Sequence, residues 1–340
     1  MKNLRAAVLG IAFMTCLGFA MSVRADENLN LITSHVPINL SATPGNKVST
    51  PIKLKNGGSQ TEKIKVSLLK FKAHGEEGQP ELMNPEANDP SSKWITFSET
   101  KFSVAPEEWK TITADIDIPQ DAAFGYYYAV VFSRDIDDVK TEEKQTVVQG
   151  GTAVLILLDV EVPNAKREVS LESFTTDSGI YEFLPAQFNV KVKNTGNIHV
   201  APRGNIFINH GDEKDIAIIE VNESKGNVLP ESSRIFTGSW NDGFPVFGEE
   251  TKDGKVVLDD DGNQVKKLQW DFSQLSSLRF GKYSAKVVLV YDDGKRQIPV
   301  EGETSFWVIP WRILLAALVL LFFIFMGFRS TWKNLFKKKK

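Results

Sequence analysis

The stretch Thr111-Ile112-Thr113-Ala114-Asp115-Ile116-Asp117-Ile118 alternates strictly between two kinds of side chain. Its even-numbered positions are aliphatic, and its odd-numbered positions are threonine or aspartate. Because neighbouring side chains of a β-strand point to opposite faces, the pattern predicts a strand with one face in a core and one in water. Asp115 and Asp117 fall on the wet face, so we interpret them as solvated groups and not as a catalytic pair of carboxylates.

The same alternation recurs through most of the chain. Between residues 26 and 308 it returns in short segments separated by turn residues, and helical periodicity is almost absent. The clearest further examples are residues 52–55, 64–68 and 188–193. Such segments are typical of antiparallel sheets with one solvated face, and the sequence therefore predicts an all-β body.

The two halves of this body share a weak internal repeat. Ile52-Lys53-Leu54-Lys55-Asn56-Gly57 matches Val190-Lys191-Val192-Lys193-Asn194-Thr195-Gly196, and residues 125–132 match residues 281–291. The matching order indicates one fold used twice. We therefore predict two tandem immunoglobulin-like β-sandwiches, at residues 26–162 and 163–308, each longer than the usual domain of that kind.

Two insertions account for the extra length. Residues 72–92 show no alternation and contain three prolines, so we predict a long loop there. Residues 244–270 contain two short apolar segments around Asp259-Asp260-Asp261-Gly262-Asn263, which predicts a hairpin inserted in the second domain. A calcium loop starting at Asp259 would need an acidic twelfth residue, and that position is Trp270. Specificity is expected to lie in these two insertions.

The first 25 residues have the composition of an export signal. Lys2 and Arg5 precede an apolar run, and Ser22-Val23-Arg24-Ala25 ends in a small residue suited to cleavage. We therefore predict a signal peptide at residues 1–25. Lipidation of Cys16 is a weaker alternative, because cleavage there would cut through the apolar run. Cys16 is the only cysteine, so the mature chain would contain none, which suits an oxidising exterior.

The other end of the chain is apolar and then basic. Residues 313–328 carry no charge, and we predict a transmembrane helix at residues 309–328. A buried core helix is the alternative, but the segment has no polar face. The residues expected at the membrane interface are Trp307, Trp311, Arg312 and Trp332.

The tail predicts the orientation. Residues 329–340 form a basic cytoplasmic tail that contains Arg329, Lys333, Lys337, Lys338, Lys339 and Lys340. An excess of basic residues marks the cytoplasmic side, so the body should lie outside the cytoplasm. All 43 acidic residues lie in that body, and it carries 13 more acidic than basic groups. Such a surface repels nucleic acid, and we exclude nucleic acid as a partner.

No catalytic or metal-binding motif is present in the sequence. It has no GxSxG, HExxH, P-loop or GxGxxG motif, and its four histidines are His35, His74, His199 and His210. His199 is predicted in a strand and His210 in a turn, a spacing unlike that of a helical metal site. We therefore predict no enzyme activity, no cofactor and no metal site. In the run Tyr126-Tyr127-Tyr128, alternation places Tyr126 and Tyr128 in the core and leaves Tyr127 for a surface role.

Several motifs resemble those of the WxL-interacting-protein family of bacterial surface proteins. In the first half these are residues 40–55 with the turn Pro44-Gly45, Asn56-Gly57, and Phe124-Gly125-Tyr126-Tyr127-Tyr128. In the second half they are residues 194–198, 229–234 and 281–283. The resemblance implies tandem immunoglobulin-like domains on one transmembrane helix, the first contacting peptidoglycan and the second contacting surface or host proteins. The first half is also similar, more broadly, to the N-terminal domain of pilus chaperones.

Two functional hypotheses follow. The first is a membrane-anchored, single-pass, non-enzymatic surface protein that binds cell-wall polymer or another surface protein through its sandwiches. The alternative is a chaperone-like or assembly factor that holds exported proteins by adding an edge strand. Both hypotheses place the function in the exposed edges and loops of the sheets.

Overall fold

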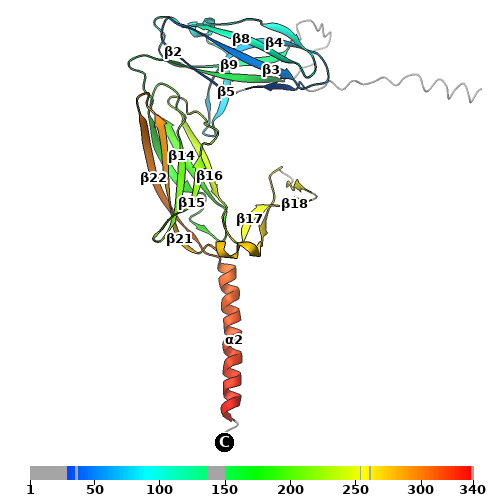
Figure 1. Ribbon diagram of the computed structural model, residues 1–340, viewed down its shortest axis with the longest axis vertical. Helices are drawn as coiled ribbons and strands as arrows, with labels where there is room; N and C mark the ends of the chain where they lie inside the picture. The colour runs from blue at the N-terminus through cyan, green and yellow to red at the C-terminus, as the bar shows by residue number, and fades with distance from the viewer. Residues whose placement is uncertain (1–28, 35–36, 136–149, 253, 260–261, 338–340) are drawn as a thin grey trace, which may run out of the picture.

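The structure is a computed structural model that describes residues 29–34, 37–135, 150–252, 254–259 and 262–337 (Figure 1). The predicted signal peptide and Lys338, Lys339 and Lys340 lie outside these residues. The chain is mostly β-sheet with one C-terminal apolar helix. This confirms the prediction of a body made of β-strands. Its strands form two modules, and the helix extends from the second (Figure 1).

The first module is a pair of sheets that face each other across a shared core. One sheet has the order β1 (Leu31–Thr33), β3 (Lys47–Asn56), β8 (Trp109–Asp117), β6 (Ile95–Phe97). The other has the order β2 (Ile38–Ala42), β10 (Gly151–Val160), β9 (Phe124–Arg134), β4 (Glu62–His74), β5 (Gln79–Met83), and β7 (Lys101–Val104) also pairs with β4. Strand β8 behaves as its alternation predicts: Ile112, Ala114 and Ile116 are at most 1% exposed.

The second module repeats this arrangement. One sheet has the order β11 (Val169–Thr176), β13 (Ala186–Asn194), β16 (Ser233–Trp240). The other has the order β12 (Ile180–Tyr181), β22 (Gln297–Val308), β21 (Gly281–Asp292), β14 (Arg203–His210), β15 (Glu213–Val221). Phe306 lies at the centre of its core and is 0% exposed. The core therefore comes from both sheets, as period-two strands with one dry face require.

A small arm extends from the second module between β16 and β21. Strand β17 (Val246–Glu249) pairs with β20 (Lys266–Gln269), and β18 (Thr251–Lys252) pairs with β19 (Lys255–Val256). These strands lie within the predicted insertion at residues 244–270. The 3-10 helix η2 (Phe272–Ser277) follows the arm and leads the chain back to β21.

The loop predicted at residues 72–92 is wrong for most of its length. Strand β4 continues to His74 and forms a hairpin with β5, in which Phe71 lies opposite Leu82. The short helix η1 (Pro90–Lys93) follows. The turn is made by Gly75 and Gly78, whose φ angles of 60° and 75° suit glycine. Pro80 and the short length of β5 hid the alternation.

Two buried asparagines account for the internal repeat. Asn194 is 0% exposed, and its amide donates to the carbonyls of Ile198 (2.8 Å) and Val228 (2.9 Å) and accepts from the Gly196 N–H (2.8 Å). Asn56 is also 0% exposed and donates to the Val104 carbonyl at 3.0 Å. Each asparagine therefore ties the turn after one strand to a distant loop of its own module.

Replacing Asn194 by alanine is expected to destabilise the second module by about 1–3 kcal/mol. The change leaves the Ile198 carbonyl and the Gly196 N–H without their partner, while the Val228 carbonyl keeps the Val200 N–H at 3.1 Å, and unpaired buried groups of this kind cost about that much. Urea unfolding of the full chain in detergent, followed by hydrogen exchange in β13, measures the effect. Asn209→Ala is the control, because its side chain accepts one exposed hydrogen bond from the Asp215 N–H. Equal stability of the two variants would contradict the bracing role of Asn194.

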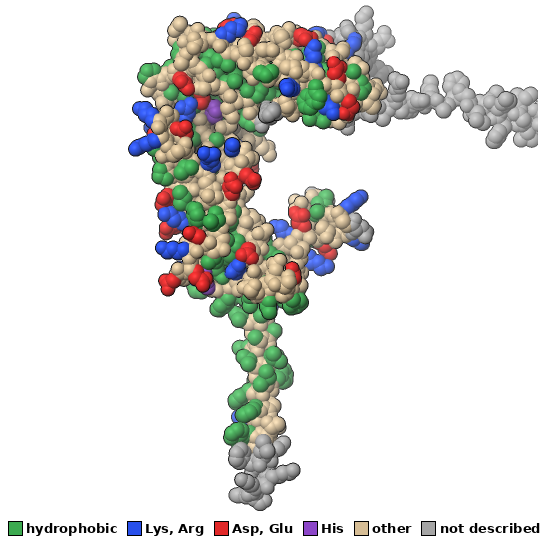
Figure 2. Space-filling view, in the orientation of Figure 1, with side chains coloured by type: hydrophobic (Ala, Val, Ile, Leu, Met, Phe, Trp, Pro, Cys, Tyr) green, Lys and Arg blue, Asp and Glu red, His purple; other side chains and the backbone are tan. Residues whose placement is uncertain are grey.

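The C-terminal helix α2 (Trp311–Lys337) projects away from the second module (Figure 1). Its segment Trp311–Trp332 has 22 residues with a mean hydropathy of 2.4, and the structure buries none of it. By length and composition this helix can cross a bilayer. Apolar side chains cover its visible face and continue onto the adjoining end of the module (Figure 2).

Candidate functional site

The two modules meet at the hairpin of β4 and β5. The Ile235 N–H donates to the Glu76 carbonyl at 2.8 Å, and the Lys191 ammonium lies 2.8 Å from the Glu76 carboxylate. Beside these contacts, Phe71 and Leu157 of the first module form a small buried cluster with Leu229 of the second. The hairpin that the sequence had predicted as a loop is therefore the main bridge between the modules.

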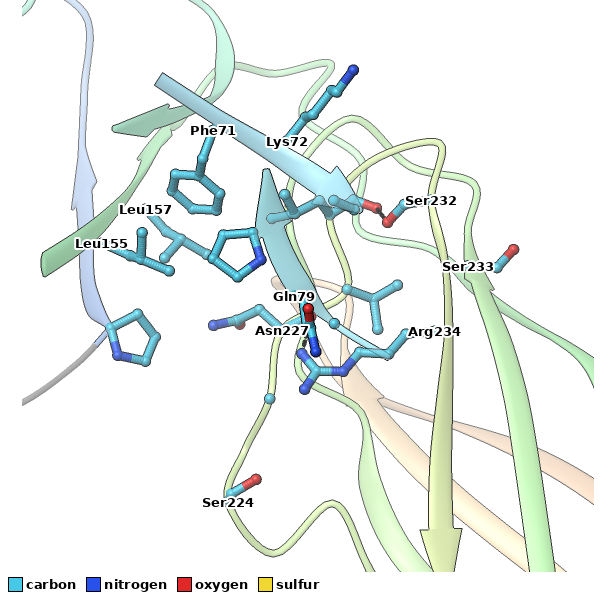
Figure 3. Close-up of a pocket in the computed structure, with 17 residues that line it drawn as sticks. Phe71, Lys72, Gln79, Leu155, Leu157, Ser224, Asn227, Ser232, Ser233 and Arg234 are labelled. Atoms are coloured by element: carbon cyan, nitrogen blue, oxygen red, sulfur yellow. Dashed lines mark hydrogen bonds between the residues drawn. The ribbon is translucent and has the colours of Figure 1, made fainter. Parts of the chain in front are cut away.

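A pocket of about 280 Å³ opens at this junction (Figure 3). Its apolar side is formed by the outer face of the first module's larger sheet, including Phe71, Leu155 and Leu157. Its polar side comes from loops and β16 of the second module, where Asn227, Ser232 and Arg234 contribute. An apolar wall with a few polar groups is the usual composition of a binding pocket.

Arg234 is a charged residue that lies partly buried in the pocket. Its guanidinium lies 5.1 Å from the ring of Phe236, and its Nη1 donates to the Asn227 carbonyl at 2.8 Å (Figure 3). Within the described part of the chain, no carboxylate lies within ion-pair distance of it. Burial lowers the pKa of Arg234 below its ordinary value. An added Cβ at Gly78 or Gly226 would lie within 2.2 Å and 2.7 Å of the guanidinium, so both glycines make room for it.

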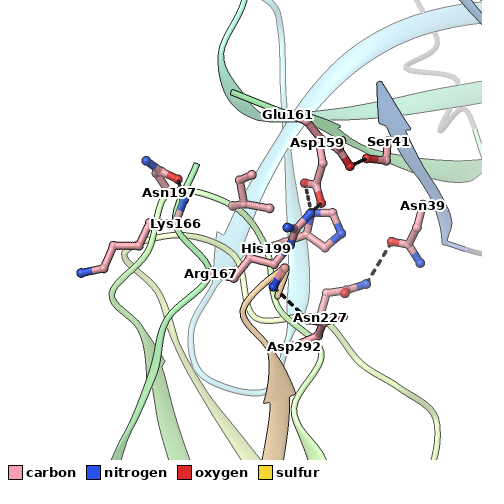
Figure 4. A network of polar contacts seen from close by, with 12 residues as sticks. Asn39, Ser41, Asp159, Glu161, Lys166, Arg167, Asn197, His199, Asn227 and Asp292 are labelled. Carbon is pink, nitrogen blue, oxygen red and sulfur yellow. Dashed lines mark hydrogen bonds and ion pairs between the residues drawn. The ribbon is translucent and has the colours of Figure 1, made fainter. Parts of the chain in front are cut away.

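A polar network joins the modules further along the same outer face of β10 (Figure 4). Asp159, which is 6% exposed, lies 3.0 Å from Nη2 of Arg167 and 2.9 Å from Nδ1 of His199. The Asp159 carboxylate and the His199 ring lie close together without hydrogen-bond geometry. Asn227 donates to Asn39 at 3.4 Å across the same junction. The ion pair thus joins Asp159 of β10 to Arg167 in the linker that precedes β11.

Tyr127 is a correction to the sequence analysis. Its ring does leave the core of the first module, but it is not a free surface residue. It packs edge-on against Phe71 and against His199, each at 5.9 Å between ring centroids, and its hydroxyl is buried. Burial and the neighbouring Asp159 raise its pKa. The second module therefore covers the face that alternation had assigned to solvent.

Strand β10 has an unpaired edge beside the pocket. On the side away from β9 it pairs with β2 from Ile156 to Val160. Among the described residues, none forms strand pairing with residues 151–155 on that side, and β1 approaches this stretch through one hydrogen bond, from the Thr152 hydroxyl to the Leu31 carbonyl at 3.3 Å. Leu155, at the end of this open stretch, lines the pocket together with Pro37, which directly precedes β2. A strand added along residues 151–155 would therefore end at the pocket.

Among the other edge strands, β22 and β15 carry residues that discourage strand addition, whereas β2 and β6 contain neither charge nor proline. Strand β22 pairs with β12 only at Trp307 and Val308, and its remaining edge contains Pro299, Glu301 and Glu303. Edge strand β15 contains several charged residues: Glu213, Lys214, Asp215 and Glu220. The open stretch of β10, Gly-Thr-Ala-Val-Leu, has neither charge nor proline. Charge and proline are the usual protection of a sheet edge, and this stretch lacks both.

The residues expected at a membrane interface lie around the start and end of the apolar helix. Trp307 is 45% exposed at the end of β22, and Trp311, 51% exposed, is the first residue of α2. Arg312 lies 5.2 Å over the ring of Trp311, and its Nε is 3.4 Å from Glu182. Trp332 is 54% exposed near the other end of the helix. The basic residues Arg329, Lys333 and Lys337 lie on α2 on both sides of Trp332, and residues 338–340 lie outside the described residues.

The histidines do not form a common site. His199 lies in the loop before the bridge residue Val200, so its predicted strand is wrong, and His210 is the last residue of β14 instead of part of a turn. His210 stacks on Tyr283 at 4.5 Å, and His74 lies 3.3 Å from Glu81. His35 lies outside the described residues. In the described part of the chain, no cluster of three or more His, Cys, Asp or Glu side chains is placed to hold a metal.

Comparison with known proteins gives structural similarities alone. No protein-family model and no curated protein matches the chain. It is similar to the class 5 fimbriae chaperone CfaA, with 14% identity over 81% of this chain and 99% of that chain and a TM-score of 0.38. It is also similar to a chain of the CsuC–CsuE chaperone and tip subunit complex of Acinetobacter baumannii, with 11% identity, 80% and 97% coverage, and a TM-score of 0.36. The CupB2 chaperone of Pseudomonas aeruginosa gives 9% identity, 82% and 100% coverage, and a TM-score of 0.32.

These TM-scores are too low to establish a common fold. The resemblance to the WxL-interacting family stays a prediction. What the chain does must therefore be argued from its own geometry.

Proposed function

We propose that this chain is a membrane-anchored, extracytoplasmic assembly factor that holds an extended segment of an exported protein along the open edge of β10. The observation that carries the proposal is the uncharged, proline-free stretch of residues 151–155. An unpaired edge offers a row of backbone N–H and C=O groups to any extended chain. The proposal assigns no catalytic residue and no cofactor.

The pocket beside this edge supports the proposal. A strand paired with residues 151–155 presents alternate side chains to the two faces of the sheet. Those on the outer face would approach Leu155 and the apolar wall formed by Phe71 and Leu157. Main-chain hydrogen bonds would supply affinity for many sequences, and the pocket would select an apolar side chain at one end.

The proposal places the body and the helix in different environments. Helix α2 spans the membrane, the two modules take the immunoglobulin-like form outside the cytoplasm, and the basic tail lies inside. A surface-exposed apolar helix of 22 residues and the basic residues after it support this orientation. Tethering would keep the β10 edge outside the cytoplasm, in the module farther from the helix (Figure 1).

Substitution at the open edge tests the proposal. The probe is a fluorescent nine-residue peptide of alternating valine and threonine with blocked ends, added to the full chain in lipid nanodiscs. We expect binding by the unaltered chain and at least a tenfold loss in Ala153→Asp, which is about 1.4 kcal/mol. The charge is placed on the open edge, where it must be desolvated by an added strand.

Ser305→Asp is the matched control, since it introduces the same charge on the exposed face of the edge strand β22. Its affinity for the peptide should equal that of the unaltered chain. Equal binding by both variants would contradict the assignment to β10. Absence of peptide binding together with retention on isolated cell wall would favour a wall-binding anchor, the other hypothesis from the sequence.

A further inference from the structure

The end of the second module that adjoins α2 is unusually apolar. Strand register fixes the position of several residues there: Ile180 pairs with Trp307, and Gly281 pairs with Val308. Val308 precedes the first residue of α2 by three positions. Ile180, Phe280 and Trp307 therefore lie level with the start of the helix, and they are 63%, 54% and 45% exposed.

Helix η2 adds more exposed apolar surface at the same level. Phe272 is 70% exposed, Leu275 is 57% exposed and Leu278 is 40% exposed. The segment from Phe272 to Leu278 contains no charged residue. We call the whole set the basal collar: Ile180, Trp270, Phe272, Leu275, Leu278, Phe280 and Trp307. Figure 2 shows hydrophobic side chains gathered where the body meets the helix.

The collar is held in place by packing behind it. Phe244, which is 5% exposed, contacts Trp270 at 5.8 Å and Phe272 at 5.5 Å between ring centroids. The Phe244 N–H donates to the Ser277 carbonyl at 2.9 Å, and the Asp271 side chain caps η2. These contacts fix the backbone that carries the exposed side chains of the collar.

We propose that the basal collar inserts into the outer interfacial layer of the bilayer that α2 crosses, so that the second module stands directly on lipid. This inference rests on the proposed membrane span. With two residues between β22 and α2, the lipid surface must lie within a few ångström of the base of the module. Exposed apolar patches of this kind mark interaction sites, and aromatic residues favour the boundary between headgroups and acyl chains.

Two basic residues beside the collar agree with this assignment, and the Asp271 carboxylate between Trp270 and Phe272 is engaged by the Ser273 N–H and hydroxyl. Arg279 at the edge of the collar is paired with Asp242 at 2.6 Å and lies 5.6 Å over the ring of Trp240. Its charge is therefore compensated above the apolar layer. Lys282, which is exposed and lies opposite Trp307 in the register, is placed to reach lipid phosphate. Attachment at the collar would fix the tilt of the module and hold the β10 edge away from the lipid.

The test measures lipid contact directly. Cys16 is replaced by alanine, and a bimane dye is attached to Phe272→Cys or Leu275→Cys in the full chain, in nanodiscs that contain one copy. Phospholipid brominated on its acyl chains quenches bimane only on contact. We expect loss of most of the fluorescence at both positions. Both side chains are largely exposed, so neither substitution disturbs the core.

Two further labels separate the collar from the span. Leu318→Cys in the middle of α2 reports whether the helix is in lipid, and Ile218→Cys is the control for exposure. Ile218 is 60% exposed, and register through Phe207 and Lys286 places it five strand positions from the collar, about 17 Å. We expect quenching at Leu318→Cys and none at Ile218→Cys.

The outcomes distinguish the two proposals. Quenching at Leu318→Cys with fluorescence at Phe272→Cys and Leu275→Cys as bright as at Ile218→Cys would overturn the collar and leave the span in place. Absence of quenching at Leu318→Cys would overturn both. Loss of dye accessibility only in discs with two copies, without quenching by brominated lipid, would assign the collar to a second copy of this chain and overturn lipid contact.

Discussion

Replacing Phe306 by alanine is expected to destabilise the second module by about 3–5 kcal/mol, the usual cost of removing a buried phenylalanine. Phe306 is 0% exposed, and its ring contacts four others, Tyr181, Phe188, Trp240 and Tyr283, at centroid distances between 5.6 and 6.1 Å. These rings come from both sheets of the module. A cavity at this point would remove contacts that join the two sheets, and the surrounding strands cannot close it without leaving their register.

The adjacent Trp307 provides the control. Its side chain is larger but points to the opposite face of β22 and is 45% exposed, so Trp307→Ala should cost about 1 kcal/mol or less. Urea unfolding of the full chain in detergent, followed by hydrogen exchange in β13 and β21, separates this module from the other. A smaller effect for Phe306→Ala than for Trp307→Ala would show that the core of the second module lies elsewhere.

The sequence predicted the strands with clear alternation and missed those without it. Residues 111–118 lie in and just after β8 with the predicted buried face, because one side of that strand meets only core and the other mostly water. Strand β5 carries Pro80 and has exposed residues on both faces, so its sequence has no period to detect. Asn56 and Asn194 were found as parts of a repeat, although only the structure shows that their amides brace distant loops.

The sequence did not predict the candidate site, because residues of both modules form it. Tyr127 has the alternation of a surface residue on its own sheet, and its burial depends on His199 of the other module. Arg234 looks like an ordinary surface charge in the sequence, and nothing local signals its desolvation. A polar residue on a closing strand, such as Asp159 among Leu157, Leu158 and Val160, was the one available signal.

The open edge of β10 and the pocket beside it are both uncharged along the side where they meet. Residues 151–155 lack the charges that protect β15 and β22, and Leu155 continues directly into the apolar wall of the pocket. An unprotected edge is an aggregation hazard unless something occupies it. The ion pair of Asp159 with Arg167 and the bridge through Glu76 keep the second module beside this edge. A client strand would therefore meet both modules at once.

Two arginines in the apolar helix are expected to release the chain from the membrane. Leu318 and Phe322 lie one turn apart on α2 and are 64% and 57% exposed. Each arginine at the centre of a span costs about 2.5–3.5 kcal/mol of insertion free energy, so Leu318→Arg with Phe322→Arg costs about 5–7 kcal/mol. The fraction of chain that resists carbonate extraction from membranes should fall by at least tenfold.

The control for this change is the double alanine variant, Leu318→Ala with Phe322→Ala, which shortens the same side chains without adding charge and should stay in the membrane. If the double arginine variant resists extraction as well as the alanine variant, lipid cannot surround this face of α2. The helix would then have to pack against another protein. The structure leaves this face of α2 uncovered, so it must contact lipid, water or a partner. Of these, lipid excludes paired arginines most strongly, and a dry protein interface would exclude them too unless it supplied acidic groups. Retention of the arginines would therefore point to an acidic partner helix, and their loss supports a helix that stands alone in the bilayer.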